Sequence, residues 1–163
     1  MTFRPAETGD IPLLRELASR IWRVSYSDLL APAQIEYMLG RMYSAPKLAQ
    51  ELADGVLWEV VLLDSLPAGY ISLSTQPDGV AELHKIYLLP ELHGRGHGQA
   101  MLAHACGLAS ERGAHSLHLR VNKRNTRALR AYERAGFRIL ESIVADIGGG
   151  FVMDDYILAR EGV

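Results

Sequence analysis

Residues 82–98 read Glu82-Leu-His-Lys-Ile-Tyr-Leu-Leu-Pro-Glu-Leu-His-Gly-Arg-Gly-His-Gly98, the most informative segment of the sequence. Its first half belongs to an apolar run, Val80 to Leu89, which predicts a strand that ends at Pro90. Its second half places glycines at alternate positions before a helix expected from about Gln99 to Arg112. Glycine lets the backbone curl with unpaired N–H groups turned outward, and the start of a helix favours an anion. The stretch therefore predicts a strand, an anion-binding loop and a helix in succession.

Diphosphate is the natural occupant of such a loop, although a glycine-rich turn between strand and helix can also be purely structural. The spacing Gly-x-Gly-x-Gly differs from the Gly-x-Gly-x-x-Gly of dinucleotide-binding folds. No Gly-Lys-Ser/Thr is present, which excludes the phosphate loop of nucleotide-hydrolysing enzymes.

Three helices and two strands are expected on the N-terminal side of this stretch. Asp10 is expected to cap the first helix, whose apolar stripe contains Leu13, Leu14, Leu17 and Ile21. The expected helices cover about 12–26, 33–43 and 46–53, and the expected strands cover 56–63 and 68–75, with a turn at 64–67. Together with Val80 to Leu89, the two strands form an antiparallel meander.

The C-terminal side predicts a strand, a capped helix and a hairpin. Residues 115–121 alternate, with Leu117, Leu119 and Val121 on one face. Asn125 caps a helix that runs to Ala135, and residues 138–147 and 151–158 pair across three glycines. Strand, helix and strand between residues 80 and 121 form a right-handed parallel crossover in an otherwise antiparallel sheet. The predicted class is α/β of the mixed α+β kind, with a mostly antiparallel sheet of six to seven strands.

The chain's composition indicates one soluble, cytoplasmic domain over residues 1–163. Hydrophobic residues make up 48% and charged residues 22% of the sequence, there is one cysteine, and no apolar run approaches the ~20 residues of a membrane span. The net charge of −2 argues against a nucleic-acid partner, although residues 112–138 hold eight bases against one acid. Neither a membrane partner nor a metal is expected.

A second group of residues lies on the predicted helix after Asn125. Asn125, Ala128, Tyr132 and Gly136 recur at steps of three and four residues, and Phe137 follows directly. That side of the helix presents a polar cap, a small surface and a phenol. A capped amphipathic helix with a buried tyrosine is the alternative interpretation.

Taken together, these residues resemble the GNAT superfamily of acetyl-CoA-dependent N-acetyltransferases. Residues 82–98 look like the family's central strand and pyrophosphate loop, and Leu117 to Phe137 look like its next strand and helix. The resemblance implies a central sheet with helices on both faces. It also implies acetyl-CoA in a cleft where the strand at 80–89 splays from the strand at 115–121.

The resemblance assigns cofactor contacts residue by residue. The backbone of Ile86, Tyr87 and Leu88 would hold the pantetheine arm, and Asn125 would contact the cofactor near that arm. The diphosphate would lie on the loop, whose members are His93, Gly94, Arg95, Gly96, His97, Gly98 and Gln99. His93 stands where the family usually has Gln or Arg, and His97 where a small apolar residue is common. Tyr132 would point at the thioester sulfur.

Acetyl transfer to an amine needs a base and an acid, and the sequence offers candidates for both. An alkylamine with a pKa near ~10.4 is protonated at neutral pH and needs a base before it can attack a carbonyl. Glu82 and His84 share a face of one strand, and either can serve; Glu82 comes first because a carboxylate also attracts an ammonium. The reaction expels a thiolate, to which Tyr132 can donate a proton, while Leu88 would supply backbone donors to the oxyanion. Cys106 lies on an apolar helical stripe and is expected to be core, which favours direct transfer in a ternary complex.

The sequence thus predicts an N-acetyltransferase that acts on a primary amine: a small metabolite, a polyamine, an amino acid or a peptide amine. The acidic excess outside residues 112–138 favours a cationic acceptor. A non-catalytic acyl-CoA-binding or sensing module of the same fold is the alternative. A homodimer is compatible with either interpretation.

Overall fold

In the computed structural model, which describes residues 1–163, seven strands form one mixed sheet in the order β1-β2-β3-β4-β5-β7-β6. The strands are β1 (Thr2–Pro5), β2 (Leu57–Leu63), β3 (Leu66–Thr75), β4 (Val80–Leu88), β5 (Ser116–Asn122), β6 (Arg138–Gly148) and β7 (Phe151–Glu161). The helices are α1 (Ile11–Ser25), α2 (Pro32–Met42), α3 (Ala45–Ala53), α4 (His97–Glu111) and α5 (Thr126–Arg134), with 3₁₀ turns η1 (Thr8–Asp10) and η2 (Pro90–Leu92). β4 and β5 are parallel, which confirms the predicted crossover.

The chain divides into two compact units. One consists of Met1–Ser72 and Lys85–His97, the other of Leu73–His84 and Gly98–Val163. β3 and β4 each contribute residues to both units.

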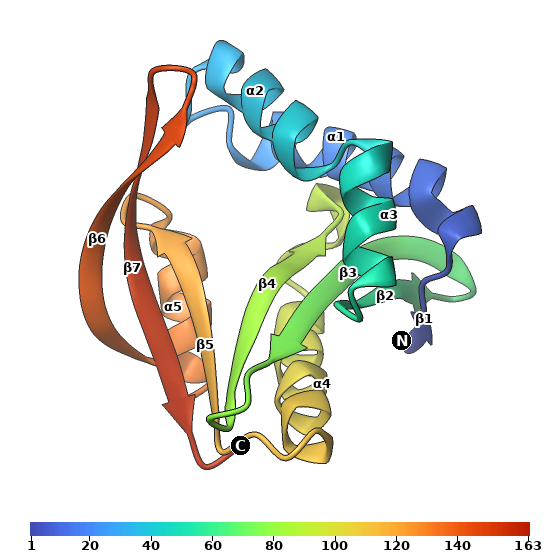
Figure 1. Ribbon diagram of the computed structural model, residues 1–163, viewed down its shortest axis with the longest axis vertical. Helices are drawn as coiled ribbons and strands as arrows, with labels where there is room; N and C mark the ends of the chain where they lie inside the picture. Colours follow the sequence, from blue (N-terminus) through green and yellow to red (C-terminus); the bar gives the residue numbers. More distant parts are fainter. The chain divides into compact units, whose positions relative to one another are not determined.

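The first unit contains the three N-terminal helices and the strands β1 and β2. α1 packs against both α2 and α3, which gather beside it in Figure 1. The buried stripe of α1 includes Leu14, Leu17 and Ile21 as predicted and continues through Trp22, whereas Leu13 is only half-buried.

Asp10 occupies the N-cap position of α1, as expected, but its carboxylate makes no capping hydrogen bond because it has other partners. Oδ2 accepts the backbone N–H of Glu7 at 2.8 Å, and both carboxylate oxygens accept from the Arg4 guanidinium. The guanidinium, followed by the Glu7 backbone N–H, lowers the pKa of Asp10. Asp10 therefore closes the turn η1 before the helix begins.

A buried aromatic cluster joins the helices of this unit to its strands. Trp22 Nε1 donates to Tyr43 Oη at 3.1 Å, and Tyr70 Oη donates to the same oxygen at 2.8 Å. Burial raises the pKa of both Tyr43 and Tyr70 well above the usual range, so these phenols stay protonated. At the edge of the cluster, the hydroxyls of Tyr26 and Tyr87 lie 3.0 Å apart. The end of β4 is therefore fixed by a hydrogen-bonded aromatic core.

Two further details of this unit differ from the sequence-based expectation. The turn after β2 is confined to Asp64 and Ser65, which have φ of 51° and 65°, so Leu66 and Pro67 belong to β3. A two-residue turn with positive φ at both positions matches the twist of a hairpin. The short strand β1, which pairs antiparallel with β2 from Thr2↔Leu62 to Pro5↔Glu59, has no counterpart in the expectation.

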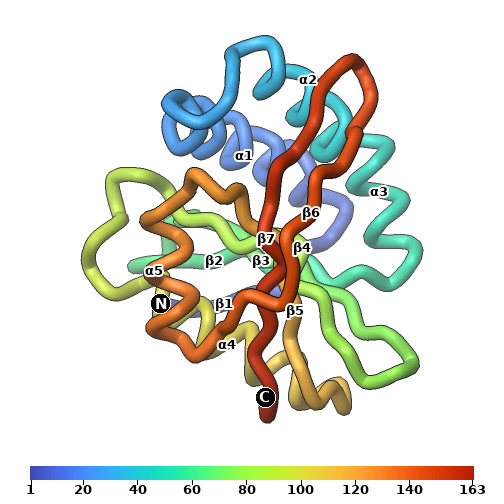
Figure 2. Tube along the Cα trace, turned by 90° about the vertical axis from the view of Figure 1, so that its left-hand side faces the viewer, coloured from blue at the N-terminus to red at the C-terminus, as the bar shows by residue number.

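The second unit packs two helices against one side of its strands. Figure 2 shows α4 and α5 on the same side of β5 and β7. Leu117, Leu119 and Val121 are buried, in agreement with the predicted alternation. The β6–β7 hairpin turns through Gly148, Gly149 and Gly150, all with positive φ, as its glycines predict.

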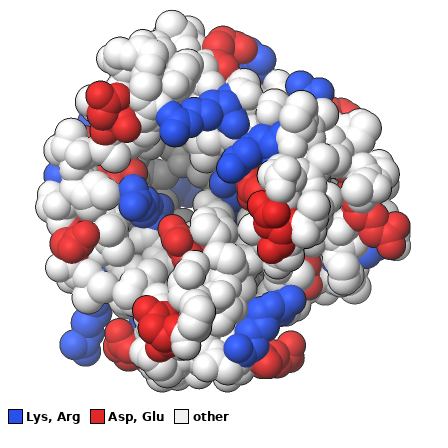
Figure 3. Space-filling model, in the orientation of Figure 1, with Lys and Arg blue, Asp and Glu red and all other residues white.

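Charges of both signs are interspersed on the face drawn in Figure 3. None of the helices combines the length and the apolar character that crossing a lipid bilayer requires.

Candidate functional site

The glycine loop is open and curled. α4 begins at His97, two residues earlier than predicted. Gly94 and Gly96 have φ of 78° and 82°, and no atom lies within 4 Å of a Cβ built at either glycine or at Gly98. The first N–H groups of α4 have no partner inside the helix. The loop therefore fits a diphosphate, which would occupy the space beside the backbone and accept from these N–H groups.

His93 ties the start of this loop to the end of β4. Its Nε2 donates to the Leu88 carbonyl oxygen at 2.9 Å. This contact explains why a histidine can stand at the first position of the loop. Its ring fixes the start of the loop to the end of β4, and the loop backbone that follows is positioned by this contact. Arg95 is exposed and His97 half-buried at the start of α4.

The side chain of Gln99 is already engaged, which leaves its backbone N–H for contact with a ligand. Nε2 donates to the Ala131 carbonyl oxygen at 2.9 Å, which joins α4 to α5. The amide N–H of Gln99 lies in the first turn of α4, where it has no partner within the helix and can donate to a bound anion.

The ladder between β4 and β5 is short. It runs from Val80↔Ser116 to Leu83↔Leu119 and stops there, although β4 continues to Leu88 and β5 to Asn122. Ile86, Tyr87 and Leu88 lie in the part of β4 beyond this ladder. Peptide groups on the β5 side of β4 beyond this ladder can bind an extended ligand by strand-like hydrogen bonds.

Helix α5 presents Asn125 and Tyr132. Asn125 Oδ1 accepts the Ala128 N–H at 3.3 Å, which confirms the predicted cap and leaves the side-chain NH₂ as the donor for a ligand. The Tyr132 ring packs edge-on against Phe137 at 5.9 Å between centroids. Gly136 has a φ of 89°, as expected for the residue that ends a helix.

Glu82 and His84 lie together on one face of β4, as predicted. Glu82 Oε1 is 3.8 Å from His84 Nδ1, and His84 Nε2 is 2.7 Å from Ser74 Oγ. A carboxylate beside an imidazole can take up a proton and pass it on, so the pair suits acid–base chemistry.

Glu82 also lines a pocket of about 190 Å³ in the second unit. Its other lining residues are Gln76, Val80, His118, Leu119, Arg120 and Ile157. Arg120 is absent from the sequence-based candidates. The alternation of residues 115–121 would have revealed it, because a strand that buries Leu117 and Leu119 turns His118 and Arg120 to the opposite face.

Cys106 is buried in α4, as expected, and its surroundings do not activate it. Burial raises the pKa of the thiol, although Arg160 donates to Sγ at 3.4 Å and opposes the shift. A thiol that stays protonated is a poor nucleophile.

Comparison with known proteins gives a consistent result. The model of the Acetyltransferase (GNAT) family matches residues 11–137. An uncharacterized N-acetyltransferase of Mycobacterium tuberculosis is 30% identical over 155 residues, which cover 93% of this chain and 97% of that protein. The spermidine N(1)-acetyltransferase of Thermoplasma acidophilum is 26% identical over 93% of this chain and 94% of its own. The crystal structure of the PaiA N-acetyltransferase of T. acidophilum in complex with coenzyme A superposes with a TM-score of 0.82, at 24% identity and 99% coverage of both chains.

Proposed function

Because the chain belongs to the acetyltransferase (GNAT) family, we propose that it transfers an acetyl group from acetyl-CoA to a primary amine, by direct attack within a ternary complex. The proposal treats residues 1–163 as one N-acetyltransferase domain. The observation that carries it is the loop at the start of α4, where Gly94 and Gly96 curl the backbone and leave room for a diphosphate.

Coenzyme A is held by backbone groups in this proposal. N–H groups of the loop from Gly94 to Gln99 bind the diphosphate, and His93 keeps the loop in place through Leu88. The peptide groups of Ile86, Tyr87 and Leu88 bind the pantetheine arm, because the β5 ladder has ended before them. The side-chain NH₂ of Asn125 donates to the same arm.

Glu82 is the base. An ammonium ion must lose a proton before its nitrogen can attack, and the exposed part of the Glu82 carboxylate can attract that ammonium and accept its proton. His84, 3.8 Å away and hydrogen-bonded to Ser74, is the alternative base or the next acceptor in a relay.

Tyr132 is the acid. As the nitrogen–carbon bond forms, the carbon–sulfur bond breaks with its electron pair remaining on sulfur, and the phenol donates a proton to that sulfur. The buried, protonated thiol of Cys106 favours this direct route over a covalent acetyl-enzyme.

The second candidate function, a non-catalytic acyl-CoA-binding or sensing module, uses the same loop but needs neither Glu82 nor Tyr132. Calorimetry with acetyl-CoA and a thiol-release assay on a panel of primary amines separate the two. We expect binding, and thiol release that requires both substrates. Binding without release on any amine would identify the sensing module, and absence of binding would refute both functions.

A further inference from the structure

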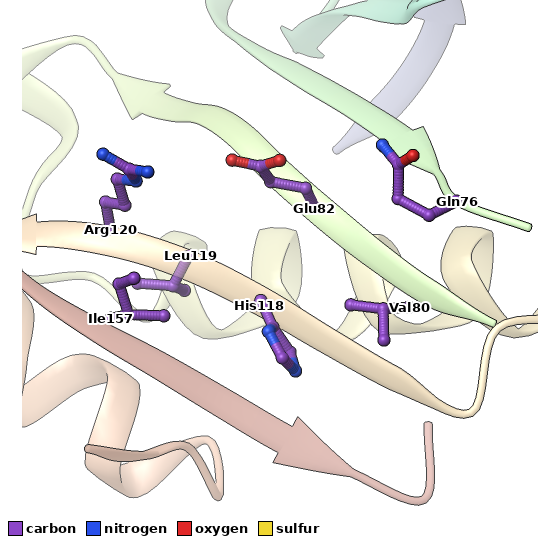
Figure 4. Close-up of a pocket in the computed structure, with 7 residues that line it drawn as sticks. All are labelled: Gln76, Val80, Glu82, His118, Leu119, Arg120 and Ile157. Carbon is purple, nitrogen blue, oxygen red and sulfur yellow. The ribbon is translucent and has the colours of Figure 1, made fainter. Parts of the chain in front are cut away.

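The pocket beside Glu82 places opposite charges on neighbouring strands. Glu82 on β4 is paired with His118 on β5, and Arg120 lies two residues further along β5. One strand spacing of about 4.8 Å and two residues of about 3.3 Å each put the Cα atoms of Glu82 and Arg120 roughly 8 Å apart. Figure 4 shows the Glu82 carboxylate and the Arg120 guanidinium extending toward one another from the two strands.

The two groups do not neutralise each other directly. Glu82 has His84 Nδ1 as its ion-pair neighbour, not Arg120. The buried Asp155 acts electrostatically on Arg120, but its Oδ1 makes no hydrogen bond, so the guanidinium does not donate to that oxygen. The pocket therefore offers one ligand both the Glu82 carboxylate, which can accept a proton, and the Arg120 guanidinium, which can donate hydrogen bonds.

We propose that this pocket binds an amine acceptor that also has a carboxylate, a free amino acid, with its amino group on Glu82 and its carboxylate on Arg120. This inference rests on the proposed function and names its substrate class. A planar guanidinium can bind a carboxylate through two parallel hydrogen bonds, which fixes the orientation of the amine as well as its affinity.

The size and walls of the pocket agree with a small zwitterion. A volume of about 190 Å³ is below the roughly 300–1,000 Å³ of sites for drug-sized ligands. Val80 and Ile157 supply apolar wall for a short side chain. A polyamine has a second cation where the amino acid has its carboxylate, and Arg120 would repel that cation.

Matched acceptors test the carboxylate directly. Leucine and phenylalanine are compared with their amides and with isoamylamine and phenethylamine, which lack the carboxylate, and with spermidine, by kcat/KM from thiol release. We expect the amino acids to exceed their matched amines by about 10- to 100-fold, the range of a charge-assisted hydrogen bond. A preference for the matched amines or for spermidine would overturn the proposal.

The variant Arg120→Gln assigns the effect to this side chain. It should lower kcat/KM for amino acids by about 10- to 100-fold, and at least tenfold more than it lowers kcat/KM for the matched amines. Arg112→Gln, at an exposed arginine after α4, is the matched control and should change neither. An equal loss on both kinds of acceptor in Arg120→Gln would show that the guanidinium does not contact the carboxylate.

Binding separates failure of this inference from failure of the proposed function. Calorimetry of leucine in the presence of coenzyme A needs no turnover. Leucine binding that is lost in Arg120→Gln supports the pocket assignment even if no acceptor is acetylated, in which case only the proposed function fails. Turnover of other amines together with no leucine binding overturns this inference alone.

Discussion

A single substitution at Tyr132 tests whether its hydroxyl donates a proton in catalysis or only contributes to packing. Its ring already contacts Phe137, so removal of the hydroxyl leaves that contact in place. We expect Tyr132→Phe to lower kcat by roughly 100-fold or more, the range for loss of a general acid. Acetyl-CoA affinity, measured by calorimetry, should stay within about twofold of the unmodified chain. Equal losses of turnover and affinity would mean that the hydroxyl organises the site and does not donate a proton.

Asp155 is a buried carboxyl whose effect on stability depends on pH. Burial raises its pKa, and Arg120 opposes the shift. A carboxyl with a folded-state pKa above its unfolded value destabilises the fold when ionised, and this penalty is relieved as the pH falls through the folded-state pKa toward 3.8. Asp155→Asn should therefore raise the melting temperature at pH 7 by about 2–4 °C, the shift for ~1 kcal/mol in a chain of this size.

The same gain in melting temperature should shrink as the pH is lowered toward 4, because the unmodified side chain then becomes neutral as well. Asp154→Asn is the control, since Asp154 is exposed and forms an ion pair with Lys123. It should not raise the melting temperature at either pH. A gain for Asp155→Asn that is independent of pH would assign the effect to packing.

Among the structural elements, the loop before α4 makes the clearest prediction. A valine at position 96 is strained, because φ is 82°, but its Cβ meets no protein atom within 4 Å. We expect Gly96→Val to lower stability by about 1–2 kcal/mol and to abolish acetyl-CoA binding in calorimetry, since its branched side chain fills the space assigned to the diphosphate.

Gly113 provides a matched control for the strain. It lies just after α4 with a φ of 80° and has equally open surroundings. Gly113→Val should lose a similar amount of stability and keep full acetyl-CoA affinity. Comparable affinities in the two variants would remove the loop from the coenzyme site.

Asn125 has two proposed functions, as the cap of α5 and as a contact to acetyl-CoA, and two substitutions distinguish them. Asn125→Ala removes the oxygen that accepts the Ala128 N–H and should reduce the free energy of unfolding by about 1 kcal/mol in urea titration. Asn125→Ser keeps a cap but lacks the NH₂ donor, so it should be nearly as stable as the unmodified chain and bind acetyl-CoA more weakly. If the serine variant binds acetyl-CoA normally, Asn125 serves the helix alone.

For the molecule as a whole, local patterns predicted the elements and missed the arrangements that depend on distant residues. The glycine loop and the Asn125 cap each depend on a few consecutive residues, so both could be predicted from the sequence. The strand β1 was not, because Thr2-Phe3-Arg4-Pro5 has little apolar character and is a strand only through its pairing with β2. The sequence placed Asp10 correctly at the N-cap of α1 but did not reveal that Arg4 and the Glu7 N–H bind its carboxylate.

The candidate site shows the same division. Glu82 and His84 could be placed together from a spacing of two on one strand. The alternation of residues 115–121 turns Arg120 to the face opposite Leu119, but only the parallel register of β4 and β5 sets it beside Glu82, and no single segment contains that register. The acceptor pocket is therefore the part of the site that is hardest to predict from sequence, because its residues come from separate strands.

A crystal structure of the chain with coenzyme A bound is the most direct test of the proposed acetyl-transfer site. We expect the diphosphate oxygens within hydrogen-bond distance of the backbone nitrogens of residues 94–99, and the coenzyme sulfur within reach of the Tyr132 hydroxyl. Coenzyme A bound with its diphosphate away from this loop would refute the site and the mechanism built on it.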